Sequence, residues 1–202
     1  MKFVAPLILA FLLAGCSAKK NVPSAAKGSS FSADQTKMIL DGAGQQPMRV
    51  YKINNHTDSL LLRRQCTDVI PDPEDPILRR FTDRLYSTVR DSISLGVGIA
   101  APQVGILRNI IWVQRFDKPD FPFEVYLNPK IIKYTDLKQD CPEGCLSIPD
   151  YRATTKTRAY AILIEYDKID GSHHTEMIED FTAVIFQHEI DHLNGILFLD
   201  RL

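Results

Sequence analysis

Residues 188–192 read His-Glu-Ile-Asp-His and constrain this chain more than any other segment. Residues four apart lie one turn above each other on a helix, so both imidazoles can reach one metal ion, with Glu189 beside it. The apolar residues of 181–193 recur near helical spacing, and Asn194-Gly195 is a typical helix C-cap. The segment therefore predicts a metal hydrolase with two histidine ligands on a C-terminal helix.

A third ligand is needed, because a catalytic metal usually has three protein ligands and one open position. Beyond His192 the only acidic residue is Asp200, close to the end of the sequence, which argues against the usual metalloprotease patterns. Upstream, Cys145 lies in Glu-Gly-Cys-Leu-Ser, a sequence that favours a tight turn presenting a thiolate. Cys145 is therefore the candidate third ligand, beside His188 and His192.

The third unusual stretch is residues 96–105, Gly-Val-Gly-Ile-Ala-Ala-Pro-Gln-Val-Gly. It lacks the lysine and the glycine spacing of nucleotide-binding loops. Small residues here would let a substrate approach the backbone closely, and Gln103 supplies a neutral amide donor. A tight turn with a solvated glutamine remains the alternative.

The order of the predicted elements indicates an α+β fold. Asp75-Pro76 begins an amphipathic helix of about four turns, with apolar residues at three- and four-residue steps. Several strands and then the C-terminal helix follow, and this block order favours α+β over a parallel α/β sheet. The strand-like runs are 109–114, 123–127, 131–134 and 159–166, the last paired with 175–178 through the turn at Asp170-Gly171.

The N-terminal residues have the layout of an export signal. Lys2 precedes an unbroken apolar run over 3–14, and Leu-Ala-Gly-Cys at 13–16 resembles the bacterial lipobox, which is cut before a cysteine that is then lipidated. We expect a signal peptide over 1–15, a flexible tether over 16–45 anchored through Cys16, and a catalytic domain over 46–202. A plain secretory signal with a chance cysteine is the alternative.

Charge and cysteine content bear on nucleic-acid binding and on disulfide formation. With 24 Lys and Arg against 25 Asp and Glu, the chain has no excess of positive charge to attract nucleic acid. If Cys16 is an anchor and Cys145 a ligand, then Cys66 and Cys141 remain, either as a disulfide or as two buried thiols.

Three segments together, GVGIAAPQVG, EGCLSIP and QHEIDHLNG, resemble in order and separation the three signature motifs of the peptide deformylase family. The resemblance extends from about Met48 to Leu202. It implies that family's fold, in which antiparallel strands pack around a C-terminal helix carrying the metal-binding motif. It also implies hydrolysis of the formyl group from N-formylmethionyl peptides, giving formate and a free N-terminal methionine.

The resemblance implies a role for each matching residue. The metal ligands would be Cys145, His188 and His192. Glu189 would be the catalytic acid and base, while Gln103 and the backbone N–H of Leu146 would face the oxyanion. The substrate peptide would lie along Gly98 and near Arg152. Val184 and Ile185, which precede His188, are candidate walls of a methionine pocket, although core packing explains either one alone.

The family's metal is typically Fe²⁺, and Zn²⁺ is the contender, because imidazole suits both and an oxidising compartment threatens iron and thiolate. We expect an exported, membrane-anchored lipoprotein facing the periplasm or the cell exterior, with formylated peptides as partners and no nucleic acid. Two alternatives stay open: a lipoprotein metalloprotease, and a non-catalytic binder of N-blocked peptides.

Overall fold

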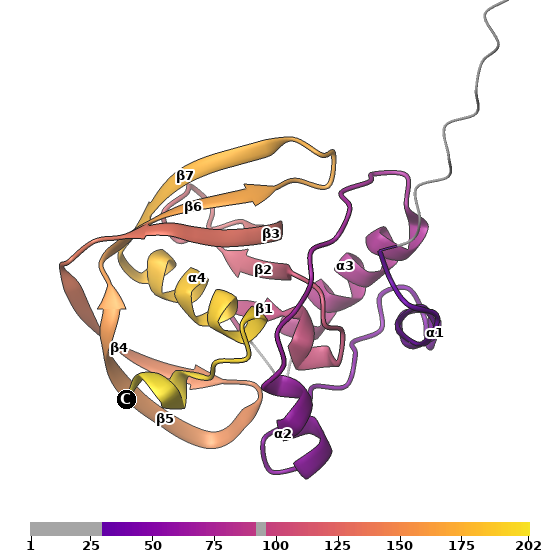
Figure 1. Ribbon diagram of the computed structural model, residues 1–202, viewed down its shortest axis with the longest axis horizontal. Coiled ribbons are helices and arrows are strands. Elements are labelled where there is room, and N and C mark those ends of the chain that lie inside the picture. Colours follow the sequence, from indigo (N-terminus) through magenta and orange to yellow (C-terminus); the bar gives the residue numbers. More distant parts are fainter. Residues whose placement is uncertain (1–29, 92–95) are drawn as a thin grey trace, which may run out of the picture.

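Helix α4 (Asp180–Leu193) lies between two antiparallel sheets, as Figure 1 shows. This computed structural model describes residues 30–91 and 96–202. The expected signal peptide, Cys16 and the tether up to residue 29 lie outside the described residues. The expected α+β class is confirmed, with antiparallel strands packed around the C-terminal helix.

The larger sheet has five strands in the order β1-β2-β3-β6-β7, and each strand is antiparallel to its neighbours. Its strands are β1 (Gly98–Ala100), β2 (Ile110–Gln114), β3 (Phe123–Tyr134), β6 (Ala161–Asp167) and β7 (His173–Glu179). The smaller sheet is a hairpin of β4 (Lys138–Cys145) and β5 (Ile148–Ala159). The other elements are α1 (Ala33–Leu40), α2 (His56–Leu62), α3 (Pro76–Val89) and two 3₁₀ turns, η1 (Ala101–Val104) and η2 (Phe198–Arg201).

Both long helices expected from the sequence are confirmed. Asp75 caps α3 by accepting hydrogen bonds from the N–H groups of Ile77 and Leu78. Helix α4 ends at the expected C-cap, where Gly195 has φ +72° and a Cβ would lie 2.4 Å from the carbonyl oxygen of Arg63. Within the core, Phe186 of α4 is fully buried against the sheet, a burial worth about 1.5–3 kcal/mol.

Strand β3 joins two runs that the sequence suggested were separate. Asn128-Pro129 looks like a break, but the structure absorbs it as an irregularity in the β3–β6 register. Asn128 takes φ +50°, and its side chain bonds the backbone N–H and C=O of Val69 and the carboxylate of Asp167. These three bonds hold the bulge in place, so the strand continues.

The segment expected to be a tether over 16–45 needs correction where the structure describes it. Helix α1 has a capping box formed by Ser32 and Gln35, and Phe31 and Ile39 are buried in the core. Arg84 of α3 donates to the carbonyl oxygen of Ile39, which satisfies the end of α1. Within the described residues, the packed part of the chain therefore includes Phe31 and Ile39, well before residue 46.

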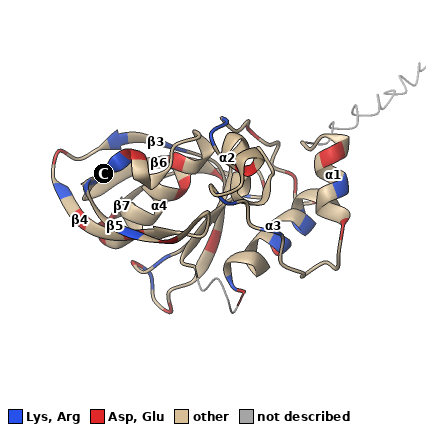
Figure 2. Ribbon diagram, turned by 90° about the horizontal axis from the view of Figure 1, so that it is seen from below, with Lys and Arg blue, Asp and Glu red and all other residues tan. Residues whose placement is uncertain are grey.

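The β4–β5 hairpin was not predicted from the sequence, although its turn was. Its strands carry many charged residues and one proline each, so no apolar alternation marks them. Figure 2 shows acidic and basic residues interspersed over the described elements. Across residues 30–91 and 96–202, no helix combines the length and apolar character that crossing a membrane requires.

The disulfide alternative for Cys66 and Cys141 is not realised, because both are free thiols. Burial raises the pKa of Cys66 to about 12. Burial also raises the pKa of Cys141. Both side chains are therefore protonated at neutral pH, and neither has the thiolate character of a metal ligand.

Candidate active site

The three expected metal ligands meet in one place. Cys145 ends β4 at the hairpin turn, and His188 and His192 lie one turn apart on α4. The Sγ of Cys145 is 3.2 Å from Nε2 of His192, and the ligand atoms of all three residues lie within 4.8 Å of one another. Burial raises the pKa of Cys145, but the two imidazoles more than offset this and hold it well below the usual value. The thiolate, which is the metal-binding form, is therefore favoured.

A buried ionic network fixes the orientation of His188. Its Nδ1 lies 2.7 Å from Oε2 of Glu143, and both carboxylate oxygens of Glu143 accept hydrogen bonds from Arg158. Burial raises the pKa of Glu143, but the bonds from His188 and Arg158 outweigh it and hold this pKa at about 2. Ionised Glu143 therefore accepts the Nδ1 proton, which leaves Nε2 of His188 available for a ligand.

Gln103 is buried on η1 and its amide is oriented by the backbone. Its Oε1 accepts a 2.8 Å hydrogen bond from the N–H of Ala100, so its Nε2 must point the other way. That nitrogen lies 3.5 Å from Sγ of Cys145 and 3.3 Å from Oγ of Ser147. The expected amide donor is thus brought to the edge of the Cys145 site, and the solvated-glutamine alternative is wrong.

Glu189 is buried on α4 beside the two histidines. Burial raises the pKa of its carboxyl group to about 7, although the charges of His188 and His192 act in the opposite direction. Within the described part of the chain its Oε2 has no hydrogen-bond partner. Such a carboxyl group can gain or lose a proton near neutral pH, and a buried oxygen without a partner is suited to meet a water molecule or a substrate.

Gly98 lies directly against this carboxyl group. A Cβ built on Gly98 would lie 2.4 Å from Oε1 of Glu189 and 2.9 Å from Cγ2 of Ile185, closer than real Cβ atoms approach. Glycine at position 98 therefore leaves room for the carboxylate of Glu189, a need that the sequence alone did not reveal. Val184 and Ile185 are both buried, and Ile185 belongs to the same hydrophobic core as Phe186.

The two remaining candidates lie on the β4–β5 hairpin. Leu146 is in the turn next to Cys145, and its backbone N–H makes no hydrogen bond to any described residue. Arg152 is exposed on β5, opposite Gly144, and its side chain forms no hydrogen bond or ion pair with the described residues. Leu146 thus offers a free donor at the site, whereas Arg152 is a free cation at the surface.

The residues present fit a divalent metal ion. One thiolate and two imidazoles are a donor set for first-row metals such as iron and zinc, and a carboxylate on the second nitrogen of a ligating histidine is the usual support. Across residues 30–91 and 96–202, this is the one group of three or more such side chains close enough to share an ion.

Replacing Glu143 with glutamine is expected to weaken metal binding by about 10- to 100-fold, because His188 would lose its charged acceptor. Competition with a chelator measures this affinity. Glu179→Gln, which changes an exposed glutamate without a side-chain capping bond, is the matched control and should bind metal normally. If both variants bind metal with equal affinity, and circular dichroism shows that both are folded, then Glu143 does not support metal binding.

Sequence reasoning did not assign the residues that support the ligands, namely Glu143, Arg158 and Asp191. Arg158 joins the carboxylates of Glu143 and Asp191 from the neighbouring strand β5. Two signals were present, since Glu143 begins the segment that contains Cys145 and Asp191 lies between the two histidines. Arg158 carried no signal, because it lies outside the three motifs, in a largely polar stretch of β5.

Comparison with known proteins agrees with this geometry. The family model of polypeptide deformylase matches residues 49–202. The peptide deformylase of Desulforudis audaxviator is 36% identical over 154 residues, covering 76% of this chain and 94% of the relative. The structure of a class I type b peptide deformylase from Acinetobacter baumannii with Met-Ala-Ser bound aligns with TM-score 0.69 and 32% identity, covering 78% of this chain and 99% of that one. The peptide deformylase of Thermotoga maritima aligns with TM-score 0.68 and 29% identity, covering 78% and 98%.

Proposed function

This chain belongs to the polypeptide deformylase family, and on that premise we propose that it is an exported, lipid-anchored peptide deformylase. It is a hydrolase that acts on N-formylmethionyl peptides. One observation supports this function best: Gln103 and Glu189 both lie beside the group formed by Cys145, His188 and His192.

Cys145, His188 and His192 would hold one divalent metal ion, with Fe²⁺ proposed first and Zn²⁺ as its contender. When bound, such an ion acts as a Lewis acid that polarises the scissile carbonyl and makes water a stronger nucleophile at neutral pH. The thiolate and imidazoles suit either metal. An oxidising compartment favours Zn²⁺, because Zn²⁺ is not oxidised there, whereas Fe²⁺ is.

The residues around this group supply the remaining chemistry. We assign to Glu189 the transfer of a proton from the attacking water to the leaving amine of methionine, a task suited to its pKa of about 7. The Nε2 of Gln103 and the N–H of Leu146 donate hydrogen bonds to the oxygen that gains charge as water attacks the formyl carbon. The substrate peptide lies along the backbone of Gly98, with Arg152 near its more distant residues.

Gly98→Ala is expected to lower kcat by about tenfold or more, because the new Cβ displaces the carboxylate of Glu189 from its working position. Steady-state kinetics with a formylated peptide measures the effect. Gly44→Ala is the matched control, since its Cβ would meet only Arg80 Nη1 at an ordinary 3.6 Å. An unchanged kcat in Gly98→Ala would show that the close approach of Gly98 to the carboxylate of Glu189 is not needed for catalysis.

A set of three peptides tests the proposed substrate class. Formyl-Met-Ala-Ser should release formate, whereas acetyl-Met-Ala-Ser and unmodified Met-Ala-Ser should stay intact, as expected of a hydrolase that acts on the formyl group. Cleavage of peptide bonds in unformylated casein would identify a metalloprotease instead. Binding of the formylated peptide without formate release, with metal confirmed present, would identify a non-catalytic binder.

The proposal of export rests on Lys2, the apolar run over 3–14 and the lipobox-like sequence that ends at Cys16. We place the enzyme on the periplasmic or outer side of the membrane, where formylated exported peptides or released signal fragments would be its substrates. Expression of the full chain in a bacterium fed labelled palmitate tests this placement. Label in the wild type but not in Cys16→Ser supports the anchor, and label in neither overturns it.

A further inference from the structure

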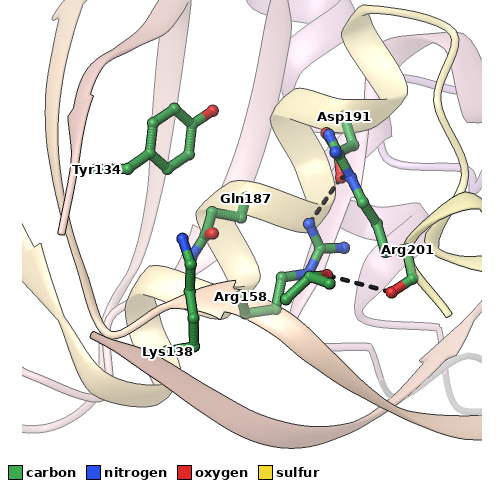
Figure 3. A pocket seen from close by; sticks show the side chains of 7 residues that line it. Tyr134, Lys138, Arg158, Gln187, Asp191 and Arg201 are labelled. Atoms are coloured by element: carbon green, nitrogen blue, oxygen red, sulfur yellow. Dashed lines mark hydrogen bonds and ion pairs between the residues drawn. The ribbon is translucent and has the colours of Figure 1, made fainter. Parts of the chain in front are cut away.

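A polar cavity of about 160 Å³ borders α4 at Gln187 and Asp191. Figure 3 labels six of its seven lining residues, Tyr134, Lys138, Arg158, Gln187, Asp191 and Arg201, and the seventh is Thr157. They come from β3, β4, β5, α4 and η2, so the cavity forms only when segments distant in sequence meet. A polar cavity of this size holds water or a small ion.

The charged groups deep in the cavity are already paired with one another. Arg158 donates to Glu143 and Asp191, and Arg201 donates to both carboxylate oxygens of Asp191. Gln187 is also satisfied, because its amide bonds the N–H and C=O of Ala159. The floor is therefore rigid and has no carboxylate without a cationic partner.

The donors at the rim, by contrast, are unused. Lys138 forms no ion pair with any described residue, and its Nζ makes only a 3.5 Å contact with the carbonyl oxygen of Thr135. The Nη1 of Arg201 and the hydroxyl of Tyr134 make no hydrogen bond within residues 30–91 and 96–202. In Figure 3, Tyr134 and Lys138 lie on the same side as Gln187, whereas Arg201 lies across the cavity beside Asp191.

The cavity adjoins the metal site, since Arg158 and Asp191 line it and also belong to the network that supports the metal ligands, but it contains none of the three ligands. Gln187 and Asp191, one turn apart, face the cavity, whereas His188 and His192 face Cys145. No residue of the Cys145, His188 and His192 group lines the cavity.

We propose that this cavity binds a small tetrahedral oxyanion, with inorganic phosphate as its simplest form. Lys138 supplies the uncompensated positive charge, and the hydroxyl of Tyr134 and Nη1 of Arg201 supply further donors from other directions. Donors from several directions match the oxygens of a tetrahedral ion. The floor of Arg158, Gln187 and Asp191 limits the ligand to a small one.

Calorimetric titration of inorganic phosphate at constant ionic strength tests this proposal. The sample is the metal-loaded full chain in a detergent without phosphate groups. Wild-type protein should show saturable binding, and Lys138→Ala should weaken it about tenfold, the typical effect of losing one charged hydrogen bond. Tyr134→Phe should weaken binding by a smaller factor and keep the same charge.

Lys133→Ala is the matched control, because Lys133 is exposed on β3 beside Tyr134 but does not line the cavity. It should bind phosphate within twofold of the wild type, or about 0.4 kcal/mol. Three results would overturn the proposal: no saturable binding in the wild type, equal weakening by Lys133→Ala and Lys138→Ala, or unchanged binding in Lys138→Ala. The last result would place phosphate elsewhere, for example at the metal.

Discussion

Glu189→Gln is expected to reduce formate release at least about a hundredfold while the protein keeps its metal. Glutamine has the shape of glutamate but cannot accept and return a proton. Glu189 lies on α4 next to His188, is buried and has a pKa of about 7, which suits this carboxyl group to accept and return a proton near neutral pH. The loss should fall on kcat, because the backbone of Gly98, the proposed substrate contact, is unchanged.

Metal analysis of the same preparation is the control for this variant. Equal metal content in Glu189→Gln and wild type shows that the lost activity comes from proton transfer. A loss of less than about threefold in formate release would be far smaller than the usual contribution of general acid and base catalysis. It would mean that Glu189 is not the proton carrier.

Cys145→Ala is expected to lose the metal, with affinity lower by more than about a hundredfold, because removing a ligand costs more than disturbing its support. Cys145 supplies the one sulfur of the group, and its thiolate is favoured by the two imidazoles beside it. Formate release should fall with the metal content. Elemental analysis after dialysis against a chelator measures the loss.

Cys141→Ala is the matched control, since Cys141 is a buried thiol in the same strand β4 and its pKa is raised by burial. It should keep its metal. Full metal occupancy in Cys145→Ala would rule out Cys145 as the third ligand, and the group would then have to be completed by another residue.

Much of the site could be predicted because its chemistry is encoded locally. The spacing of His188 and His192 on an amphipathic helix and the turn around Cys145 each leave a signal within a few residues. The same holds for α3, whose cap at Asp75 and apolar spacing are local features. These elements lie where they were expected.

The parts that were missed depend on contacts between distant segments. The packing of helix α1 is one example, because it depends on Phe31 and Ile39 contacting the core that includes α3. Arg158 reads as a surface residue until β5 places it between Glu143 and Asp191. The need for glycine at position 98 also appears only when β1 and α4 meet.

Formate release during metal titration tests the central claim most directly. Protein stripped of metal is titrated with Fe²⁺ under anaerobic conditions, and in parallel with Zn²⁺, in the presence of a formylated methionyl peptide. The group of Cys145, His188 and His192 predicts that the rate rises with added metal up to one ion per chain and then stays constant. Formate release without metal, or no release from protein carrying one bound ion, would contradict it.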